Sequence, residues 1–222
     1  MRLLSVNVGR ETPIEGAGKS GKTGICKRPV DGPVAVTPDG LAGDTISDTK
    51  NHGGVDQAVY VFGAPDYAWW SERLGQELPP GTFGENLTVS GFESAAAGVG
   101  DRLVVGRVVL EVTAPRIPCA TLGARMGDPA FLKRFRWAER PGVYCRVIRA
   151  GGVRAGDGVE YVPYPGDRLP VLEVFRAFFD ARSGEEVLRR QLAAPIAARA
   201  REAYEGRLAG LTVKNTSVRS GG

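Results

Sequence analysis

A single short segment combines a thiol, a cation and two prolines. It reads Pro115-Arg116-Ile117-Pro118-Cys119. The prolines restrict the backbone that carries Cys119, and a cation near a thiol favours the thiolate form. Because a thiolate is a preferred ligand of soft metals, Cys119 is a candidate metal ligand. The same residues fit a buried structural cysteine equally well.

A second candidate is His52, the one histidine of the chain. It precedes Gly53 and Gly54, which lack side chains and let backbone approach a ligand closely. His52 could relay protons, or its ring could bond only to its own loop. Asp44 and Asp56 could orient His52, although capping a turn is the commoner use of such residues. With one histidine, multi-histidine zinc or iron sites are excluded.

Polar groups in two further segments have similar alternatives. Lys27 could hold a phosphate or be a solvated surface lysine. Glu85 and Asn86 offer an acceptor and an amide donor beside a pocket, or they bond within their own loop. Glu85 is also a possible proton relay. The chain contains no P-loop and no GxGxxG segment, so nucleotide binding by those routes is not supported.

The elements that must position these residues are mainly short strands. The 31 glycines and 15 prolines indicate many turns. Alternating or β-branched runs predict strands over residues 3–8, 58–62, 86–89, 102–105, 107–113, 143–149 and 159–162. Helical spacing predicts helices over residues 65–78 and 129–137.

The pattern changes near residue 165. Val171, Val174, Phe175 and Phe178 mark one helix face, and two more helices are expected through residue 192 and from about 197 to 208. We therefore expect an α+β fold that is mainly β, with a barrel-like domain at residues 1–165. A small three-helix unit should follow at residues 166–210, and residues 211–222 should form a flexible tail.

The net charge, the number of cysteines and the length of the apolar runs argue against several classes of protein. The net charge is +4, and residues 167–210 hold eight Arg against seven Asp or Glu, so nucleic-acid binding is unlikely. Cys26, Cys119 and Cys145 are too few and too widely spaced for a disulfide framework. No signal-peptide core and no 18-residue apolar run occur, which predicts a cytoplasmic protein that does not span a membrane.

Together these segments resemble the MOSC domain family, named for the C-terminal domain of molybdenum-cofactor sulfurases, and within it the bacterial YiiM-type branch. The shared motifs are GIxKxPV at residues 24–30, GLxGD at 40–44, HGGxDxAVY at 52–60, GxFGENL at 81–87, PRxPC at 115–119 and PGVYCRV at 141–147. The likeness covers nearly the whole chain, and the motifs keep their order and spacing. Where the branch usually has GRxGxY, this chain has Glu139-Arg140-Pro141-Gly142-Val143-Tyr144, which could alter one pocket wall and the substrate.

The resemblance implies a barrel-like core that holds the molybdenum cofactor in its molybdopterin form, with Cys119 as the ligand of molybdenum. It implies reduction of N-hydroxylated compounds such as hydroxylaminopurines, with electrons from a separate flavin-type reductase. The residues expected to contact the cofactor are Cys119, Lys27, His52, Asp56, Phe83, Gly84, Asn86 and Arg116, and those expected to act in catalysis are Cys119, His52 and Glu85. Larger relatives carry a pyridoxal-phosphate domain ahead of this one, but the chain has no room for it, so that cofactor is not predicted.

Two other functions stay open at this stage. One is a carrier or binding module for the cofactor or for sulfur, without turnover. The other is a cysteine hydrolase or transferase in which Cys119 works with His52 and with Asp56 or Asn86, with no metal. A monomer and a homodimer are both compatible with the sequence.

Overall fold

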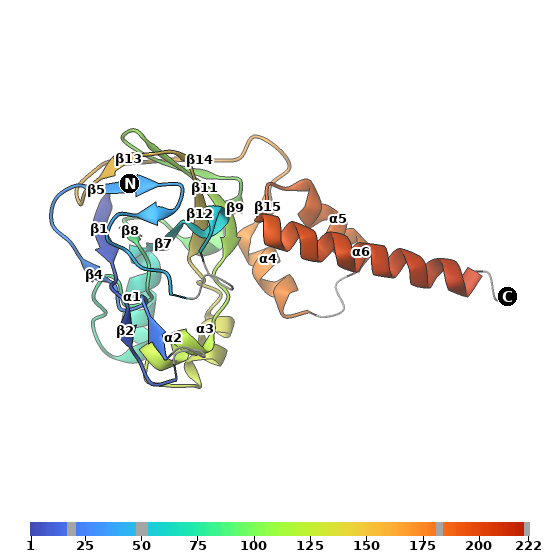
Figure 1. Cartoon of the computed structure of the whole chain (residues 1–222), viewed down its shortest axis with the longest axis horizontal. Helices are drawn as coiled ribbons and strands as arrows, with labels where there is room; N and C mark the ends of the chain where they lie inside the picture. The colour runs from blue at the N-terminus through green and yellow to red at the C-terminus, as the bar shows by residue number, and fades with distance from the viewer. Residues whose placement is uncertain (17–20, 48–52, 181–183, 220–222) are drawn as a thin grey trace.

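The computed structural model describes residues 1–16, 21–47, 53–180 and 184–219, with side chains as far as residue 211. A strand-rich body carries three C-terminal helices on one side, and the last of them extends away from the body (Figure 1). The body consists of one large sheet, smaller sheets and three helices.

The large sheet has eight strands in the order β14-β10-β11-β12-β7-β8-β1-β4. Their bounds are β1 Leu3–Val8, β4 Arg28–Pro29, β7 Val59–Gly63, β8 Leu87–Val89, β10 Arg102–Val105, β11 Val108–Pro115, β12 Val143–Arg149 and β14 Val159–Val162. The pairings within this sheet are antiparallel except the one between β7 and β8.

The sheet closes on itself through the start of the chain. Arg2 forms an antiparallel bridge with Gly158, next to β14. The backbone N–H of Leu3 donates to Asp157 at 2.8 Å, and the N–H of Val159 donates to Met1 at 2.9 Å. These bonds satisfy edge groups that an open sheet would expose. The predicted mainly β, barrel-like domain is therefore confirmed.

Three smaller sheets flank the barrel. Their strands are β2 Thr12–Pro13 with β3 Lys22–Thr23, β9 Gly98–Val99 with β15 Leu169–Pro170, and β13 Gly151–Val153 with β5 Val34–Thr37 and β6 Gly40–Leu41. None of these was predicted. Gly151 pairs with Val36, more than a hundred residues earlier, so tertiary contact and not local preference forms this sheet.

Three helices belong to the body, with bounds α1 Ala64–Leu74, α2 Ala120–Arg125 and α3 Phe131–Ala138. The helix predicted over residues 65–78 ends earlier because Gly75 adopts the left-handed conformation with φ 66° and caps it. The short helix α2 was not predicted, and Cys119 is its N-cap residue. Short 3₁₀ turns occur at Val55–Gln57 and Ser94–Ala96.

The body has two groups of buried apolar side chains. One fills the barrel with aliphatic residues from most of its strands. The other is aromatic and packs α1 and α3 against the sheet, with Phe62 stacked on Phe83 at 4.5 Å and Trp70 close to Phe135. Aromatic pairs at such distances add to the stability that buried area alone provides. The aromatic group underlies the ends of the strands that carry the candidate site.

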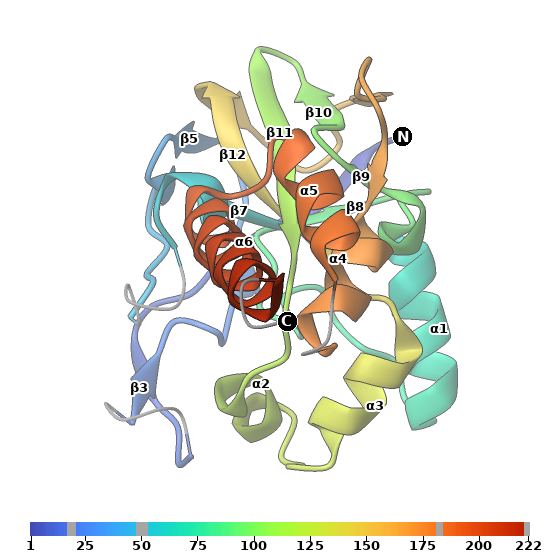
Figure 2. The ribbon, with the colours of Figure 1, turned by 90° about the vertical axis from the view of Figure 1, so that its right-hand side faces the viewer.

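The C-terminal helices are α4 Val171–Phe178, α5 Glu185–Ala193 and α6 Ala198–Arg219. They gather on one side of the barrel, in front of β11 and β12 in the view of Figure 2. The structure extends α6 through Arg219, into the segment at residues 211–222 whose flexibility stays a prediction. The helical segment shares the barrel's core, to which Val171 of α4 and Ala194 and Ile196 of the α5–α6 connection contribute buried side chains. The boundary at residue 165 stays a prediction.

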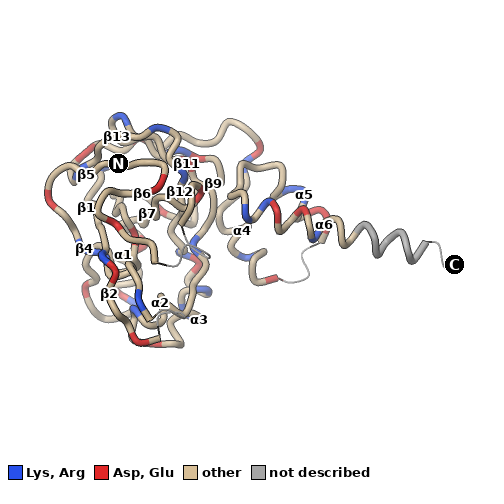
Figure 3. Tube along the Cα trace, viewed as in Figure 1, with Lys and Arg blue, Asp and Glu red and all other residues tan. Residues whose placement is uncertain are grey.

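Charged residues of both signs are interspersed over α4, α5 and the described part of α6 (Figure 3). Several form ion pairs, such as Arg190 with Glu173 at 2.8 Å and Arg189 with Glu185 at 2.8 Å. Within the described ranges, no helix has the length and apolar character needed to cross a membrane.

Candidate functional site

The centre of the site is the guanidinium of Arg116, which follows the last residue of β11. The side chain is 4% exposed. One terminal nitrogen, Nη1, donates to the carbonyl oxygen of Phe83, and the guanidinium lies 5.0 Å over the ring of Tyr60. Its Nε is buried and has no hydrogen-bond partner. Among the described residues, no carboxylate lies within ion-pair distance of Arg116. Because burying a charge without an opposite charge is costly, Arg116 is a candidate binding element for an anion.

Cys119 lies within electrostatic range of this guanidinium. It is half-buried, and its carbonyl accepts the backbone N–H of Leu122 at 2.9 Å as α2 begins. Tyr144, on β12, interacts with both Arg116 and Cys119. The rings of Tyr144 and Tyr60 are 5.0 Å apart. Two tyrosines and a thiol thus interact electrostatically with the buried cation.

Burial and these neighbours shift the titration of the group. Burial acts to lower the pKa of Arg116, but Tyr144, Tyr60 and Cys119 outweigh it, so the pKa is raised. Burial raises the pKa of Tyr144 and Tyr60, while Arg116 opposes that rise. Arg116 therefore stays charged, and both hydroxyls stay protonated at neutral pH. The hydroxyl of Tyr60 already donates its proton to the carbonyl of Pro141 at 2.8 Å, whereas the hydroxyl of Tyr144 is able to donate a hydrogen bond.

A second charged group adjoins the first. The Nζ of Lys27 forms a buried ion pair with Asp44. The amide Nδ2 of Asn86 donates to the same carboxylate oxygen at 2.8 Å, and the N–H of Gly9 donates to the other oxygen at 2.8 Å. Burial lowers the pKa of Lys27, although Asp44 acts in the opposite direction. Asp44 therefore offsets much of the charge that Lys27 was expected to offer to a phosphate.

Glu85 is fully buried, and its Oε1 is occupied by protein donors. It accepts from the hydroxyl of Tyr67 and the N–H of Gly81, both at 2.6 Å, and from the hydroxyl of Thr88 at 2.8 Å. Its Oε2 is buried without a partner. Burial raises the pKa of Glu85, while these bonds act to lower it. Of these donors only Gly81 belongs to the same loop, whereas Tyr67 lies on α1 and Thr88 on β8, so Glu85 joins three elements. Its role as a proton relay stays a prediction.

Phe83 and Gly84 contribute to the site mainly with their backbone atoms. The ring of Phe83 is fully buried in the aromatic group, so only its carbonyl faces Arg116. Gly84 has φ +74°, and a Cβ there would lie 2.6 Å from Cγ1 of Ile25 and 3.5 Å from Nη1 of Arg116. A residue without a side chain is needed for this close approach.

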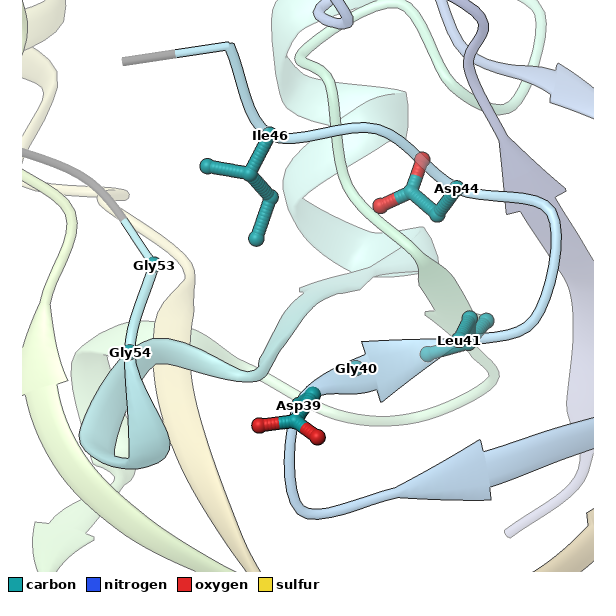
Figure 4. Close-up of a pocket in the computed structure, with 7 residues that line it drawn as sticks. All are labelled: Asp39, Gly40, Leu41, Asp44, Ile46, Gly53 and Gly54. Atoms are coloured by element: carbon teal, nitrogen blue, oxygen red, sulfur yellow. The ribbon is translucent and has the colours of Figure 1, made fainter. Parts of the chain in front are cut away.

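A pocket of about 250 Å³ borders the charged group and shares Asp44 with it. The loop after β6, with Ile46, forms one wall, and Gly53 and Gly54 form the facing wall (Figure 4). Asp39, at the turn before β6, lies at the pocket with its carboxylate exposed. His52 lies outside the described residues, so the structure gives it no position.

Asp56 is not brought into this group. Its carboxylate pairs with Arg146 at 3.0 Å and accepts the N–H of Ala198 at 2.6 Å. Of the two remaining cysteines, Cys145 is fully buried in the barrel core and Cys26 is half-buried. None of the three cysteines forms a disulfide.

Side chains of the segments at residues 24–28, 83–87 and 115–119 interact with one another, whereas Asp56, of the segment at residues 52–56, does not join them. Lys27 interacts with Arg116 and Glu85, and Arg116 interacts with Cys119, so one chain of contacts joins them. The sequence reasoning did not select Tyr60 and Tyr144 as site residues, although both lie inside the quoted motifs. Their alternation along β7 and β12 was the available signal, but it indicates only which face of a strand they share.

The side chains at the site provide few ligands for a metal ion. In the part of the chain that the structure describes, no group of three or more His, Cys, Asp or Glu side chains could hold a metal ion. Cys119 supplies one sulfur beside a buried cation. Such a site suits a group that brings most of its own metal ligands and carries negative charge.

The comparisons with known proteins agree with this architecture. The MOSC domain family model matches residues 48–160. "Uncharacterized protein YflK" of Bacillus subtilis is 36% identical over 158 residues, which cover 71% of this chain and 72% of that protein. A "Reductase" of Gibberella moniliformis is 33% identical over 78% of this chain, and the match spans only 31% of that protein.

Solved structures show the same fold. The crystal structure of YiiM from Geobacillus stearothermophilus superposes with a TM-score of 0.76 at 27% identity and covers 93% of this chain and 98% of that one. The structure of YiiM from Escherichia coli has a TM-score of 0.74 at 22% identity, with 95% and 94% coverage. From the family model and these relatives, the chain belongs to the MOSC domain family.

Proposed function

We propose that the chain binds the molybdenum cofactor in its molybdopterin form and reduces N-hydroxylated compounds such as hydroxylaminopurines. Electrons would come from a separate flavin-type reductase. The observation that carries this proposal is the thiol of Cys119 beside the buried guanidinium of Arg116, which has no carboxylate partner in the described ranges. Membership of the MOSC family and the reductase name of one relative support it.

The residues fit the cofactor in charge and in ligand type. A thiolate is a soft ligand for the metal, and it would be stabilised by Arg116. The Nε of Arg116 is buried without a hydrogen-bond partner, so the charge of the guanidinium is incompletely compensated by the described residues and would favour a nearby anionic group. Gly84 lets its loop pack closely against Ile25 and next to Nη1 of Arg116, which keeps the loop against the buried guanidinium.

Removal of oxygen from R–NHOH to give R–NH2 and water consumes two electrons and two protons. Molybdenum, if held there, would supply the two-electron redox chemistry that side chains do not have. Cys119 would hold the metal, and Arg116 would balance the charge of the ligands. The hydroxyl of Tyr144 stays protonated beside Cys119, so it would donate a hydrogen bond to the oxygen that leaves. Asn86 would hold Asp44 and the wall of the pocket in position.

The test is Cys119→Ser, with Cys26→Ser as the matched control. Each protein is made in a host that synthesises the cofactor, and its molybdenum and pterin content is measured together with the reduction of an N-hydroxylaminopurine. Serine replaces a soft ionisable ligand with a hard neutral one of nearly the same size. We expect turnover per bound cofactor to fall by a factor of about 100 or more in Cys119→Ser and to stay unchanged in Cys26→Ser.

Three results would contradict the proposal. Full turnover by Cys119→Ser at equal cofactor loading would return Cys119 to a structural role. A loaded wild-type protein that reduces no N-hydroxylated compound with any reductase would indicate a carrier. Wild-type protein that contains no molybdenum and hydrolyses an ester through Cys119 would indicate a cysteine hydrolase.

A further inference from the structure

The loop of residues 53–57 forms one wall of the pocket but has little to hold it in place by itself. Gly53 and Gly54 both have positive φ, 76° and 77°. Val55 is 61% exposed, so its burial contributes little. Within the loop, the N–H of Gln57 donates to the carbonyl of Gly54 at 2.9 Å, and no side chain caps the 3₁₀ turn. The position of this wall must depend on bonds to other elements.

Those bonds lead to the C-terminal helices. One carboxylate oxygen of Asp56 pairs with Nη2 of Arg146 at 3.0 Å, and the other accepts the N–H of Ala198, the first residue of α6, at 2.6 Å. The same Nη2 of Arg146 donates to the carbonyls of Pro195 and Ile196, each at 3.1 Å. Asp56 and Arg146 thus connect the pocket loop, β12 and the α5–α6 connection.

The far end of this connection is firmly anchored. Ile196 and Ala194 are each 3% exposed and belong to the core that fills the barrel. The guanidinium of Arg201 donates to the carbonyls of Leu192 and Ala194 at 2.9 and 2.8 Å, which ties α6 back to the end of α5. A carboxylate bound to such a fixed element loses freedom itself, and so does the loop that carries it.

The near end reaches the residues beside Cys119. The hydroxyl of Thr113, on β11, lies 2.5 Å from the carbonyl of Asp56 and 3.1 Å from the carbonyl of Tyr144. A displacement of the loop would therefore disturb the backbone at Tyr144 as well as the pocket wall formed by Gly53 and Gly54.

We propose that Asp56 and Arg146 are positioning residues through which the C-terminal helices hold the pocket wall at residues 53–57. The C-terminal helices then belong to the site, and the bonds of Asp56 and Arg146 connect them to it. The consequence for substrate binding rests on the proposed function, whereas the consequence for the loop does not.

The test uses Asp56→Asn and Arg146→Lys in the full-length protein, with Arg190→Lys as control. Arg190 forms an exposed pair with Glu173 on the same helical unit. Hydrogen exchange of the amides of residues 53–57 and 198 is measured first. We expect exchange to become about tenfold faster in both variants, as for the loss of one charge-assisted bond, and to stay unchanged in Arg190→Lys. KM for the N-hydroxylated substrate should rise about tenfold in both, with kcat within about twofold.

The outcomes separate this proposal from the proposed function. Faster exchange at residues 53–57 and 198 supports the coupling even if no substrate is reduced. Exchange that is no faster than in Arg190→Lys overturns it. Loss of cofactor from Asp56→Asn alone, with Arg146→Lys unchanged, also overturns it, because Asp56 would then contact the cofactor directly. Faster exchange with an unchanged KM would overturn the assignment of these helices to the site.

Discussion

The substitution Arg116→Met tests whether this guanidinium serves to bind the cofactor or to stabilise the fold. The two roles predict different changes in the free energy of unfolding of the protein without cofactor. Methionine fills much of the volume of arginine without its charge. The substitution removes a guanidinium that is 4% exposed, together with its bond to the carbonyl of Phe83 and its contact with the ring of Tyr60.

The expected stability change is the balance of two terms. A carbonyl left without a donor costs about 1–3 kcal/mol. Burying an ion without a compensating partner costs several kcal/mol, which the variant no longer bears. The free energy of unfolding of the protein without cofactor should therefore change by no more than about 1 kcal/mol or should rise. Affinity for the cofactor should fall about 10- to 100-fold, since one hydrogen bond between charged groups contributes about 1.5–3 kcal/mol.

The measurements are urea unfolding of protein made without cofactor, and titration with released molybdopterin. Arg102→Met is the control, because Arg102 is half-exposed and pairs with Glu111 at 2.9 Å on the same sheet. An exposed pair contributes about 0–1 kcal/mol and should leave cofactor affinity unchanged. If Arg116→Met destabilises the empty protein by more than about 3 kcal/mol while its affinity is normal, the guanidinium is structural and the reasoning fails.

Two substitutions test the loop that carries Gly84 and Glu85. Gly84→Ala should destabilise the protein more than Gly32→Ala. Both glycines have positive φ, which costs an L residue roughly 1–2 kcal/mol, but only at Gly84 would the added Cβ clash with Ile25. Equal losses of the free energy of unfolding in urea would argue against that contact. Burial raises the pKa of Glu85 from its ordinary value of 4.5, so the native state retains a proton that the unfolded chain loses. This contribution to stability is present below pH 4.5 and is lost as pH rises through the folded pKa. Glu85→Gln should therefore be more stable than wild type at neutral pH, and a stability difference that does not vary with pH would contradict the shift.

The Cys119 and Asp56–Arg146 substitutions described above complete the set. They probe the proposed metal ligand and the pocket wall by different contacts, because the carboxylate of Asp56 binds Arg146 and Ala198.

Much of the sheet was predictable because its pattern is local. The strands at residues 3–8, 102–105, 143–149 and 159–162 have the predicted bounds. Alternation along a strand follows from side chains pointing to opposite faces, and β-branched residues favour that geometry without reference to distant parts of the chain. The motifs around Lys27, Asn86 and Cys119 were also found from sequence, because each is a run of adjacent residues at a strand end.

The tertiary structure alone determined what each charged side chain contacts. Lys27 was expected to be available to a phosphate, but Asp44 pairs with it. Asp56 was expected at the cofactor, but it binds Ala198, which lies 142 positions later in the chain. The bridge that closes the barrel likewise joins two residues far apart in the sequence, Arg2 and Gly158. Local preference specifies the elements, whereas the partner of a buried charge depends on which element packing brings within hydrogen-bond distance, and short-range patterns carry no information on that.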